Sequence, residues 1–275
     1  MSAEEYETLR ALLKEKKNVI LQGAPGVGKT FAAKRLAWSI LGEANEDRIE
    51  TIQFHQNYSY EDFIMGYKPQ EEGFELEEGI FLNVCEKASK NKDLPYFFII
   101  DEINRGNISK IFGELMQLIE KDYRDQQIRM PYNKKPFSVP ENLFIIGMMN
   151  TADRSLALID YALRRRFSFY EMVPGFETAG FKNYQASINN ESFNRMIRLI
   201  QRLNEEIRQD TTLGKGFCIG HSYFTGQTKE SFSEDWLKRV IQFDILPMLN
   251  EYWFDDESKI DEWEIRLMDV FSDEI

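Results

Sequence analysis

The sequence predicts an α/β protein with a parallel sheet between helices, followed by a smaller helical domain. Up to Tyr170, short continuous apolar runs alternate with helical patterns, which is typical of parallel strands covered on both faces. A glycine-rich loop joins the first of these runs to a helix. After Pro174-Gly175 the apolar residues recur only at helical spacing. We therefore expect a core over residues 1–173 and a helical domain over residues 174–275.

A short helix should precede the first strand, because Ser2 and Glu5 match a capping box ahead of helically spaced apolar residues. The apolar runs that we interpret as strands are residues 18–22, 51–54, 96–100, 143–149 and 167–170. A helix is expected over residues 30–41, ended by Gly42. Residues 67–81 and 128–140 have turn residues between short extended segments, which indicates two inserted hairpins.

Helical spacing also defines the second domain. The apolar residues that repeat in this way are Phe193, Met196, Ile200, Leu203 and Ile207, and later Ile260, Trp263, Leu267 and Phe271. A strand pattern is lacking in this part of the sequence, so the domain should consist of helices.

Length and charge limit the possible functions. A chain of 275 residues with 43% hydrophobic and 29% charged residues has the composition of one or two globular domains. The 34 basic and 46 acidic residues give a net charge of −12. This charge disfavours tight nucleic-acid binding by the chain alone, unless a local basic patch or a separate DNA-reading domain provides it.

The cysteine and histidine content excludes two kinds of site. Cys85 and Cys218 are too few for a disulfide framework, and with two histidines the chain lacks the ligands of a dedicated zinc cluster. No apolar stretch reaches the roughly 18 residues of a membrane span, and the first residues do not form a signal peptide. We expect a cytoplasmic protein without membrane contact.

The strongest motif is a phosphate-binding loop. Gly23-Ala24-Pro25-Gly26-Val27-Gly28-Lys29-Thr30 matches the pattern G-x-x-x-x-G-K-[ST] between a predicted strand and a predicted helix. Glycines let the backbone N–H groups surround phosphates, and the helix N-terminus adds positive potential. Lys29 would reach the β- and γ-phosphates, and the Thr30 hydroxyl would ligate Mg²⁺.

Two further strands end in polar residues. The run Phe97-Phe98-Ile99-Ile100 is followed by Asp101 and Glu102, at the sheet edge where the loop should also lie. Asp101 would hold Mg²⁺, and Glu102 would orient or deprotonate the attacking water. The run 143–149 ends at Asn150, whose amide could bind the γ-phosphate or the water, although asparagine is also a common turn former.

Three arginines come just before the last predicted strand, in Ala162-Leu163-Arg164-Arg165-Arg166-Phe167. They could complement the dipole at the end of a helix. Alternatively, one of them could act as an arginine finger in a neighbouring subunit, where a guanidinium stabilises the charge of a transferring phosphate.

The order of these motifs resembles that of the AAA+ NTPases, and three segments resemble the McrB subunits of McrBC-type modification-dependent restriction systems. The segments are Asp101-Glu102-Ile103-Asn104-Arg105-Gly106, Met149-Asn150-Thr151-Ala152-Asp153-Arg154-Ser155 and Gly214-Lys215-Gly216-Phe217-Cys218-Ile219-Gly220-His221-Ser222-Tyr223-Phe224. Residues 53–64 are similar to the same family. In all, the resemblance runs from about Asn18 to the neighbourhood of Trp253 and covers most of the chain.

The resemblance implies an AAA+ P-loop NTPase core with a C-terminal helical lid. It also implies GTP hydrolysis with Mg²⁺, a homo-hexamer or similar ring, and stimulation by an McrC-like nuclease subunit. The McrB family reads modified cytosine through an N-terminal domain, and the roughly 20 residues before the loop leave no room for one. DNA would then be engaged through a missing or separate domain.

The prediction that the nucleotide is GTP rests on the resemblance alone, because the guanine-reading motif N-K-x-D is absent. The nearest segment, Asn133-Lys134-Lys135-Pro136, is better interpreted as a turn. Two other functions remain open: an AAA+ ATPase of another branch that remodels proteins, and a nucleotide-binding ring scaffold. A nuclease centre in this chain itself is disfavoured, because no second cluster of carboxylates and lysine is found.

The resemblance also assigns roles to individual residues. The loop from Gly23 to Thr30, with Asp101, Glu102 and Asn150, would form the site of one subunit. Arg105, Asp153 and Arg154 would tune it. Arg166 is the favoured finger and Arg165 the next candidate, with a structural salt bridge as the alternative for each. The lid lacks a sensor arginine, so His221 is a candidate for nucleotide contact, although a lone histidine is more often structural.

Overall fold

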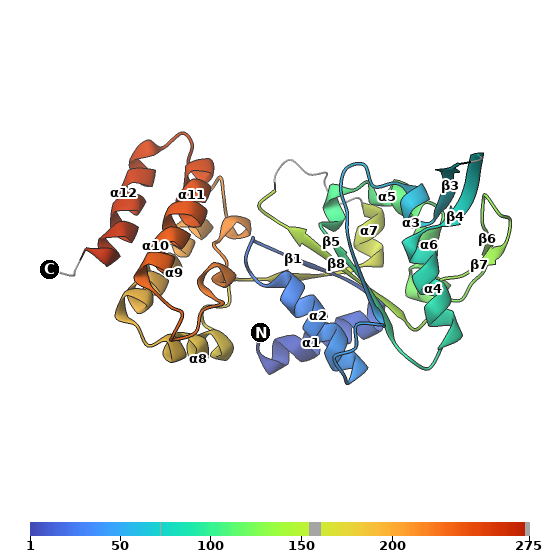
Figure 1. Ribbon diagram of the computed structural model, residues 1–275, viewed down its shortest axis with the longest axis horizontal. Coiled ribbons are helices and arrows are strands. Elements are labelled where there is room, and N and C mark those ends of the chain that lie inside the picture. The colour runs from blue at the N-terminus through green and yellow to red at the C-terminus, as the bar shows by residue number, and fades with distance from the viewer. Residues whose placement is uncertain (72, 154–160, 273–275) are drawn as a thin grey trace. The chain divides into compact units, whose positions relative to one another are not determined.

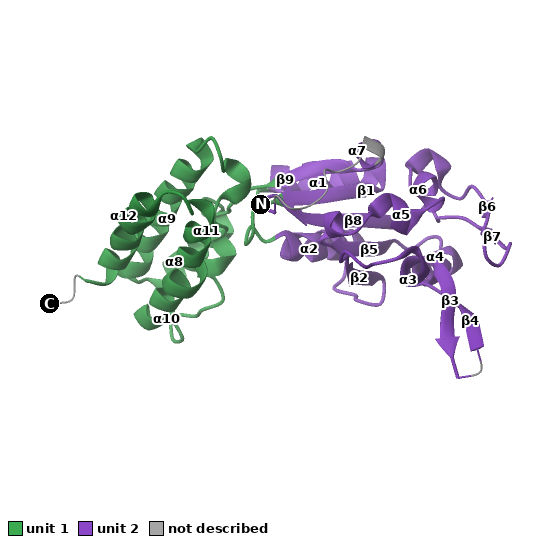
Figure 2. Ribbon diagram, turned by 90° about the horizontal axis from the view of Figure 1, so that it is seen from above, with its two compact units in different colours: residues 1–2, 23–28, 172–275 green, residues 3–22, 29–171 purple. Residues whose placement is uncertain are grey.

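The computed structural model describes residues 1–71, 73–153 and 161–272 (Figure 1). These residues divide into two compact units, which Figure 2 distinguishes by colour. The core unit comprises residues 3–22 and 29–171. The lid unit comprises residues 1–2, 23–28 and 172–275. The lid portion thus begins at Met172, beside the expected boundary, and the tip of the glycine loop is grouped with it by its contacts.

The core unit is built on a five-stranded parallel sheet, as the apolar runs predicted. Its strands, in spatial order, are β2 (Ile49–Gln53), β5 (Tyr96–Asp101), β8 (Leu143–Asn150), β1 (Asn18–Gly23) and β9 (Ser168–Met172). In the parallel register of β5, Asp101 lies beside Gln53 of β2, and Ile100 lies beside Gly147 of β8. Because parallel strands end at the same edge, the polar residues after β1, β5 and β8 are brought to one side of the sheet.

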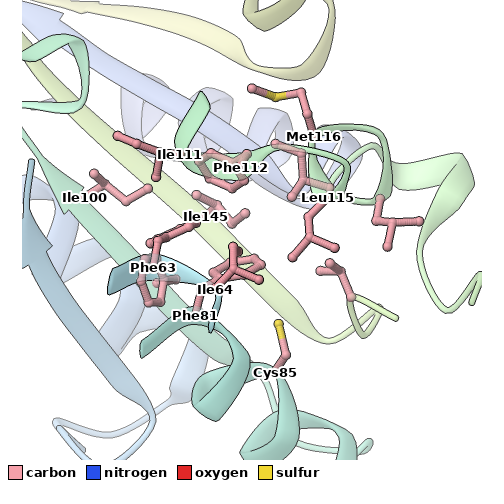
Figure 3. Packing of buried hydrophobic residues seen from close by; sticks show 14 of the residues in the cluster. Phe63, Ile64, Phe81, Cys85, Ile100, Ile111, Phe112, Leu115, Met116 and Ile145 are labelled. Atoms are coloured by element: carbon pink, nitrogen blue, oxygen red, sulfur yellow. The ribbon is translucent and has the colours of Figure 1, made fainter. Parts of the chain in front are cut away.

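Helices cover the sheet. Its three central strands, β5, β8 and β1, are buried on both faces, whereas the edge strands β2 and β9 are partly exposed. The helices of the core unit are α1 (Ala3–Lys16), α2 (Lys29–Leu41), α3 (Tyr60–Phe63), α4 (Ile80–Lys90), α5 (Ile108–Phe112), α6 (Leu115–Leu118) and α7 (Tyr161–Arg166). Ile100 and Ile145 pack with Phe63, Phe81 and Phe112 in a cluster formed with α3 to α6 (Figure 3). The residues of β5 and β8 that alternate with them are also buried, which explains why these two strands are continuous apolar runs.

Two antiparallel hairpins occur where the sequence contains turn residues between extended segments. In the first, β3 (Met65–Gln70) pairs with β4 (Gly73–Glu78). In the second, β6 (Ile128–Arg129) pairs with β7 (Pro136–Phe137). The first hairpin ends earlier than residue 81, because Phe81 lies in the first turn of α4 and is fully buried.

The lid unit has a separate helical core. Its helices are α8 (Ala179–Ile188), α9 (Glu191–Gln209), α10 (Glu234–Arg239), α11 (Leu246–Tyr252) and α12 (Glu257–Met268), with a π-helical segment at Val240–Ile245. The five helically spaced apolar residues of α9 are all buried, as their spacing predicted. Asn190 caps α9, because its Oδ1 accepts a hydrogen bond from the N–H of Phe193. Phe271, expected on the last helix, instead lies in a 3₁₀ turn that follows α12.

Among the described helices, none is both long and apolar enough to cross a membrane.

Candidate functional site

Three of the residues singled out in the sequence form a hydrogen-bonded chain in the core unit. Lys29 begins α2, Asn150 ends β8, and Glu102 follows β5. The Lys29 Nζ donates to Asn150 Oδ1 at 2.6 Å, and Asn150 Nδ2 donates to Glu102 Oε1 at 2.6 Å. The single amide of Asn150 therefore connects a cation to a carboxylate, and both of its polar atoms are used.

Burial determines the electrostatics of Lys29. The residue is 9% exposed. Desolvation of the ammonium lowers the pKa of Lys29 to about 8, while the carboxylates of Glu102 and Asp101 act in the opposite direction. A buried ammonium with a lowered pKa gains from any further anion that binds beside it, and a phosphate is such an anion.

Glu102 has an unusual backbone conformation. It lies in the left-handed region, with φ 50° and ψ 43°, and its N–H donates to Asp101 Oδ1 at 3.0 Å. For a residue with a Cβ this conformation costs roughly 1 kcal/mol or more, and such outliers cluster at functional sites. The strained residue immediately precedes the 3₁₀ turn Ile103–Arg105.

Both oxygens of the Glu102 carboxylate are engaged. Oε1 accepts from Asn150, and Oε2 accepts from Arg105 Nε at 3.1 Å. Arg105 Nη2 also donates to Asp153 Oδ2 at 3.2 Å, so Asp153 joins the same network. These donors fix the orientation of the carboxylate. Arg154, which the sequence placed beside Asp153, lies outside the described residues.

Thr30 and Asp101 have the donor chemistry that a magnesium ion requires. Thr30 is the second residue of α2 and is exposed, and Asp101 ends β5 and is half-buried. A hydroxyl and a carboxylate are the hard oxygen ligands that Mg²⁺ takes together with water and phosphate. The electrostatic interaction of Asp101 with Lys29 places this carboxylate near the lysine. The side chains of Thr30 and Asp101 therefore fit a magnesium ion.

The tip of the glycine loop packs against the lid turn His221–Phe224 within the lid unit. The N–H of Ser222 donates to the carbonyl of Gly26 at 2.9 Å. Gly26 has φ 75°, which favours glycine at this position. Gly220 allows the close approach of the two backbones, because a Cβ added to it would overlap backbone atoms of Gly26 and Pro25. The conformation of the loop is therefore coupled to that of the lid turn.

His221 has a defined orientation in this turn. Its Nδ1 accepts a hydrogen bond from the N–H of Gly175 at 2.9 Å, so the ring proton is assigned to Nε2. Nε2 is 3.8 Å from the position that a Cβ of Gly28 would occupy. Burial, and then the positive N-terminus, lower the pKa of His221, which favours the neutral ring. The structure thus places a potential N–H donor beside the last glycine of the loop.

The three consecutive arginines end α7, and two of them share one carboxylate. Arg165 Nη2 and Arg166 Nη2 are 2.7 and 3.0 Å from Glu120 Oε1. The Arg165 side chain is 68% exposed, whereas that of Arg166 is 12% exposed. Arg164 instead lies over the ring of Phe169. Both finger candidates are therefore in a salt bridge, and Arg165 is the more accessible.

Three polar residues of this region were not singled out in the sequence. Asn18, Glu120 and Arg124 contact the end of α7 or one another. A signal exists only for Asn18, which is a polar residue at the start of a continuous apolar strand. Glu120 and Arg124 lie in a turn without a recognisable motif.

Comparison with known families decides the classification of the core. The family model of the AAA domain (dynein-related subfamily) matches residues 18–167, which include the loop, Asp101, Glu102 and Asn150. The chain belongs to this AAA family. The model of the McrB alpha-helical lid domain matches residues 195–261. The resemblance to McrB-type AAA+ domains is therefore confirmed in both parts of the chain.

Two curated relatives are restriction proteins. The chain is 50% identical over 272 residues to the type IV methyl-directed restriction enzyme EcoKMcrB subunit of Escherichia coli (strain K12), with 95% of this chain and 59% of the relative covered. It is 27% identical over 292 residues to the type II restriction enzyme BsuMI component YdiS of Bacillus subtilis (strain 168), with 89% and 81% covered. The chain thus spans 59% of the length of the first relative.

Proposed function

We propose that this chain is the GTP-hydrolysing motor part of an McrB-type restriction subunit. The observation that carries the proposal is the hydrogen-bonded chain that starts at Lys29, the lysine of the phosphate-binding motif, and runs through Asn150 to Glu102. A cation, an amide and an oriented carboxylate in this order are the groups that phosphoryl transfer to water needs.

The roles of the residues follow from their chemistry. The ammonium of Lys29 binds β- and γ-phosphate oxygens and leaves Asn150 Oδ1 free to accept from the attacking water. Glu102 orients that water and accepts its proton, while the water oxygen bonds to the γ-phosphorus and the bond to the diphosphate leaving group breaks. A Mg²⁺ ion, held by Thr30 and Asp101, neutralises phosphate charge when it is bound. Arg105 and Asp153 keep Glu102 in its orientation.

The site of one subunit is completed by a neighbour in a ring of six or a similar number of copies. Arg165 or Arg166 supplies the guanidinium that stabilises charge on the transferring phosphate. His221 contributes a donor from the lid turn. The EcoKMcrB relative is named as a subunit of a methyl-directed restriction enzyme, which supports an McrC-like nuclease as partner and modified cytosine as the signal. With a net charge of −12, the chain leaves DNA reading to another domain.

The test is Mg²⁺-dependent hydrolysis of GTP and ATP, measured side by side at several protein concentrations. Wild type and Glu102→Gln are compared, and nucleotide binding is measured for both. GTP turnover well above ATP turnover, rising with subunit concentration and lost in Glu102→Gln, is the expected result. Preference for ATP would contradict the McrB-type assignment and favour a protein-remodelling ATPase. Binding without turnover, even with an added McrC-like nuclease, would instead favour a nucleotide-binding scaffold.

A further inference from the structure

Asn18 occupies a buried polar position at the start of β1, the strand that leads to the phosphate-binding loop. It is 0% exposed. Its Nδ2 donates to two backbone carbonyls, that of Ile119 at 2.8 Å and that of Arg166 at 3.0 Å. Its Oδ1 accepts from Arg124 Nη2 at 2.8 Å. One side chain thus connects β1, the turn at residues 119–124 and the end of α7.

Arg124 holds this turn from the interior. The residue is 7% exposed, and burial lowers the pKa of its guanidinium to about 10, so it stays protonated at neutral pH. Its Nε donates to the carbonyl of Ile119 at 2.9 Å, and Nη1 donates to the carbonyls of Pro140 and Leu143 at 3.2 and 3.0 Å. Each of these acceptors is neutral. A buried cation with neutral acceptors is a poor source of stability, but it fixes geometry strongly.

Glu120 belongs to the same turn and holds the arginine side chains. Its carboxylate is 16% exposed and lies within 3.0 Å of a guanidinium nitrogen of both Arg165 and Arg166. Lys16 Nζ additionally donates to the carbonyl of Arg165 at 3.3 Å. The arginine pair is therefore held at its backbone by Asn18 and Lys16 and at its side chains by Glu120.

We propose that Asn18, Glu120 and Arg124 form a brace that positions Arg165 and Arg166 for action on the nucleotide of a neighbouring subunit. The brace residues do not touch that nucleotide; they act through the arginine pair. The proposal rests on the proposed function, because it requires a ring in which an arginine acts in trans. It goes further by predicting that a residue of the strand before the loop controls the neighbour's site.

The two possible roles of Asn18 make opposite predictions in mixed rings. A residue that only supports β1 and the loop would affect hydrolysis in its own subunit. A residue of the brace would impair the site of the next subunit and leave its own site intact. A defect of the second kind can be rescued by a subunit that is inactive but has a normal arginine pair.

The test uses Asn18→Asp, which retains an acceptor for Arg124 and loses both N–H donors. A carboxylate facing the carbonyl of Arg166 displaces the end of α7. Since a misplacement of about 1 Å can lower a rate about 100-fold, we expect turnover to fall about 10- to 100-fold, with nucleotide binding retained. Mixing this variant with Glu102→Gln, at fixed total protein, should raise turnover well above the sum of the separate samples.

Asn142→Asp is the matched control. Asn142 also uses its amide to hold backbone, donating to the carbonyls of Ala88, Asn91 and Leu94, and it does not contact the arginine pair in the described structure. Asn142→Asp loses the same two amide N–H donors as Asn18→Asp, but its turnover should stay within about twofold of wild type. An equal loss of turnover in Asn142→Asp would assign the Asn18 effect to general destabilisation and overturn the proposal.

A second mixture separates this proposal from the proposed function. The double variant Arg165→Ala/Arg166→Ala is mixed with Glu102→Gln in the same way. If turnover of the double arginine variant is rescued in this mixture, but turnover of Asn18→Asp is not, the brace alone is overturned. Failure of rescue for the double arginine variant removes the trans-acting arginine and with it the basis of both proposals. Unchanged turnover of Asn18→Asp alone also overturns the brace.

Glu120→Gln gives an independent reading if Asn18→Asp does not fold. It retains a hydrogen-bond acceptor for one guanidinium and loses the charge that both share. Its matched control is Glu114→Gln, a carboxylate that accepts from the Tyr60 hydroxyl and has no arginine partner in the described structure. Glu120→Gln should be rescued by Glu102→Gln subunits, and reduced turnover without rescue would overturn the brace.

Discussion

Asn150 and Glu102 are joined by a hydrogen bond of 2.6 Å from the Asn150 amide nitrogen to the Glu102 carboxylate, although they lie 48 residues apart in the chain. The other end of the amide accepts from Lys29. The amide cannot be flipped without placing its nitrogen against an ammonium and its oxygen against a carboxylate. The amide of Asn150 therefore has one orientation, and its hydrogen bond fixes the position of the Glu102 carboxylate.

Replacing Asn150 by aspartate tests this relationship. In Asn150→Asp the donor to Glu102 becomes a carboxylate oxygen, and two like charges at hydrogen-bond distance raise the pKa of one of them. We expect turnover to fall by about 100-fold or more, as for the loss of a donor in an active site. The nucleotide Kd should rise, because the introduced carboxylate competes with phosphate for Lys29. Steady-state kinetics and equilibrium binding check this, and a turnover close to wild type would show that Asn150 is only a turn former.

The lowered pKa of Lys29 predicts proton uptake on nucleotide binding. With a pKa of about 8, about half of the Lys29 side chains are neutral at pH 8 in the free protein. Phosphate beside the ammonium raises that pKa, so binding should take up about half a proton at pH 8 and much less at pH 6.5. Calorimetric titration with Mg²⁺-nucleotide, in buffers of different ionisation enthalpy, counts these protons. Equal heats in all buffers at pH 8 would refute the predicted shift.

The close approach of Gly220 to Gly26 predicts that position 220, just before the lid turn, tolerates no side chain. In Gly220→Ala the new Cβ would overlap backbone, so the turn must move away from the loop. We expect a loss of about 1 to 3 kcal/mol of stability, the usual range for overpacking, together with weaker nucleotide binding. Thermal unfolding with and without nucleotide measures both.

Gly180→Ala is the control for this change. Gly180 lies in α8, and a Cβ there would meet nothing within 4 Å. Alanine in a helix should stabilise the lid unit by up to about 1 kcal/mol. If both variants behaved alike, the backbone contact between Gly220 and Gly26 would have no energetic importance.

The lowered pKa of His221 predicts that the folded protein loses stability in acid. Its folded pKa lies below the ordinary histidine value of 6.5, so the unfolded chain binds the proton more tightly and stability falls as the pH decreases below about 6.5. Above that pH the contribution is constant. His221→Asn can present Oδ1 to the N–H of Gly175 and does not titrate. Urea unfolding between about pH 5 and 8 should therefore show a smaller acid loss for the variant, and parallel curves would exclude His221 as the cause.

Much of the fold was predictable because its signals are local. The five apolar runs became the five strands. The signal is strongest for the central strands, since a strand buried on both faces must be apolar along its whole length, whereas β2 and β9 are partly exposed. The loop, Asp101, Glu102 and Asn150 were also found locally, because parallel strands deliver the residues that follow them to one edge. The end of the first hairpin was set too late, because Phe81 fits equally well as a strand residue or as part of the buried face of α4.

The sequence by itself determined which residues are available for phosphate chemistry and on which edge of the sheet they gather. Only the tertiary structure decided how they are held: that Arg105 links Glu102 to Asp153, that His221 accepts from Gly175, and that Asn18 reaches the end of α7. The reason is physical. Strand and loop patterns depend on neighbours in the chain, whereas the hydrogen bonds that hold His221 and Asn18 join segments 46 and 148 residues apart and leave no periodic trace in the sequence.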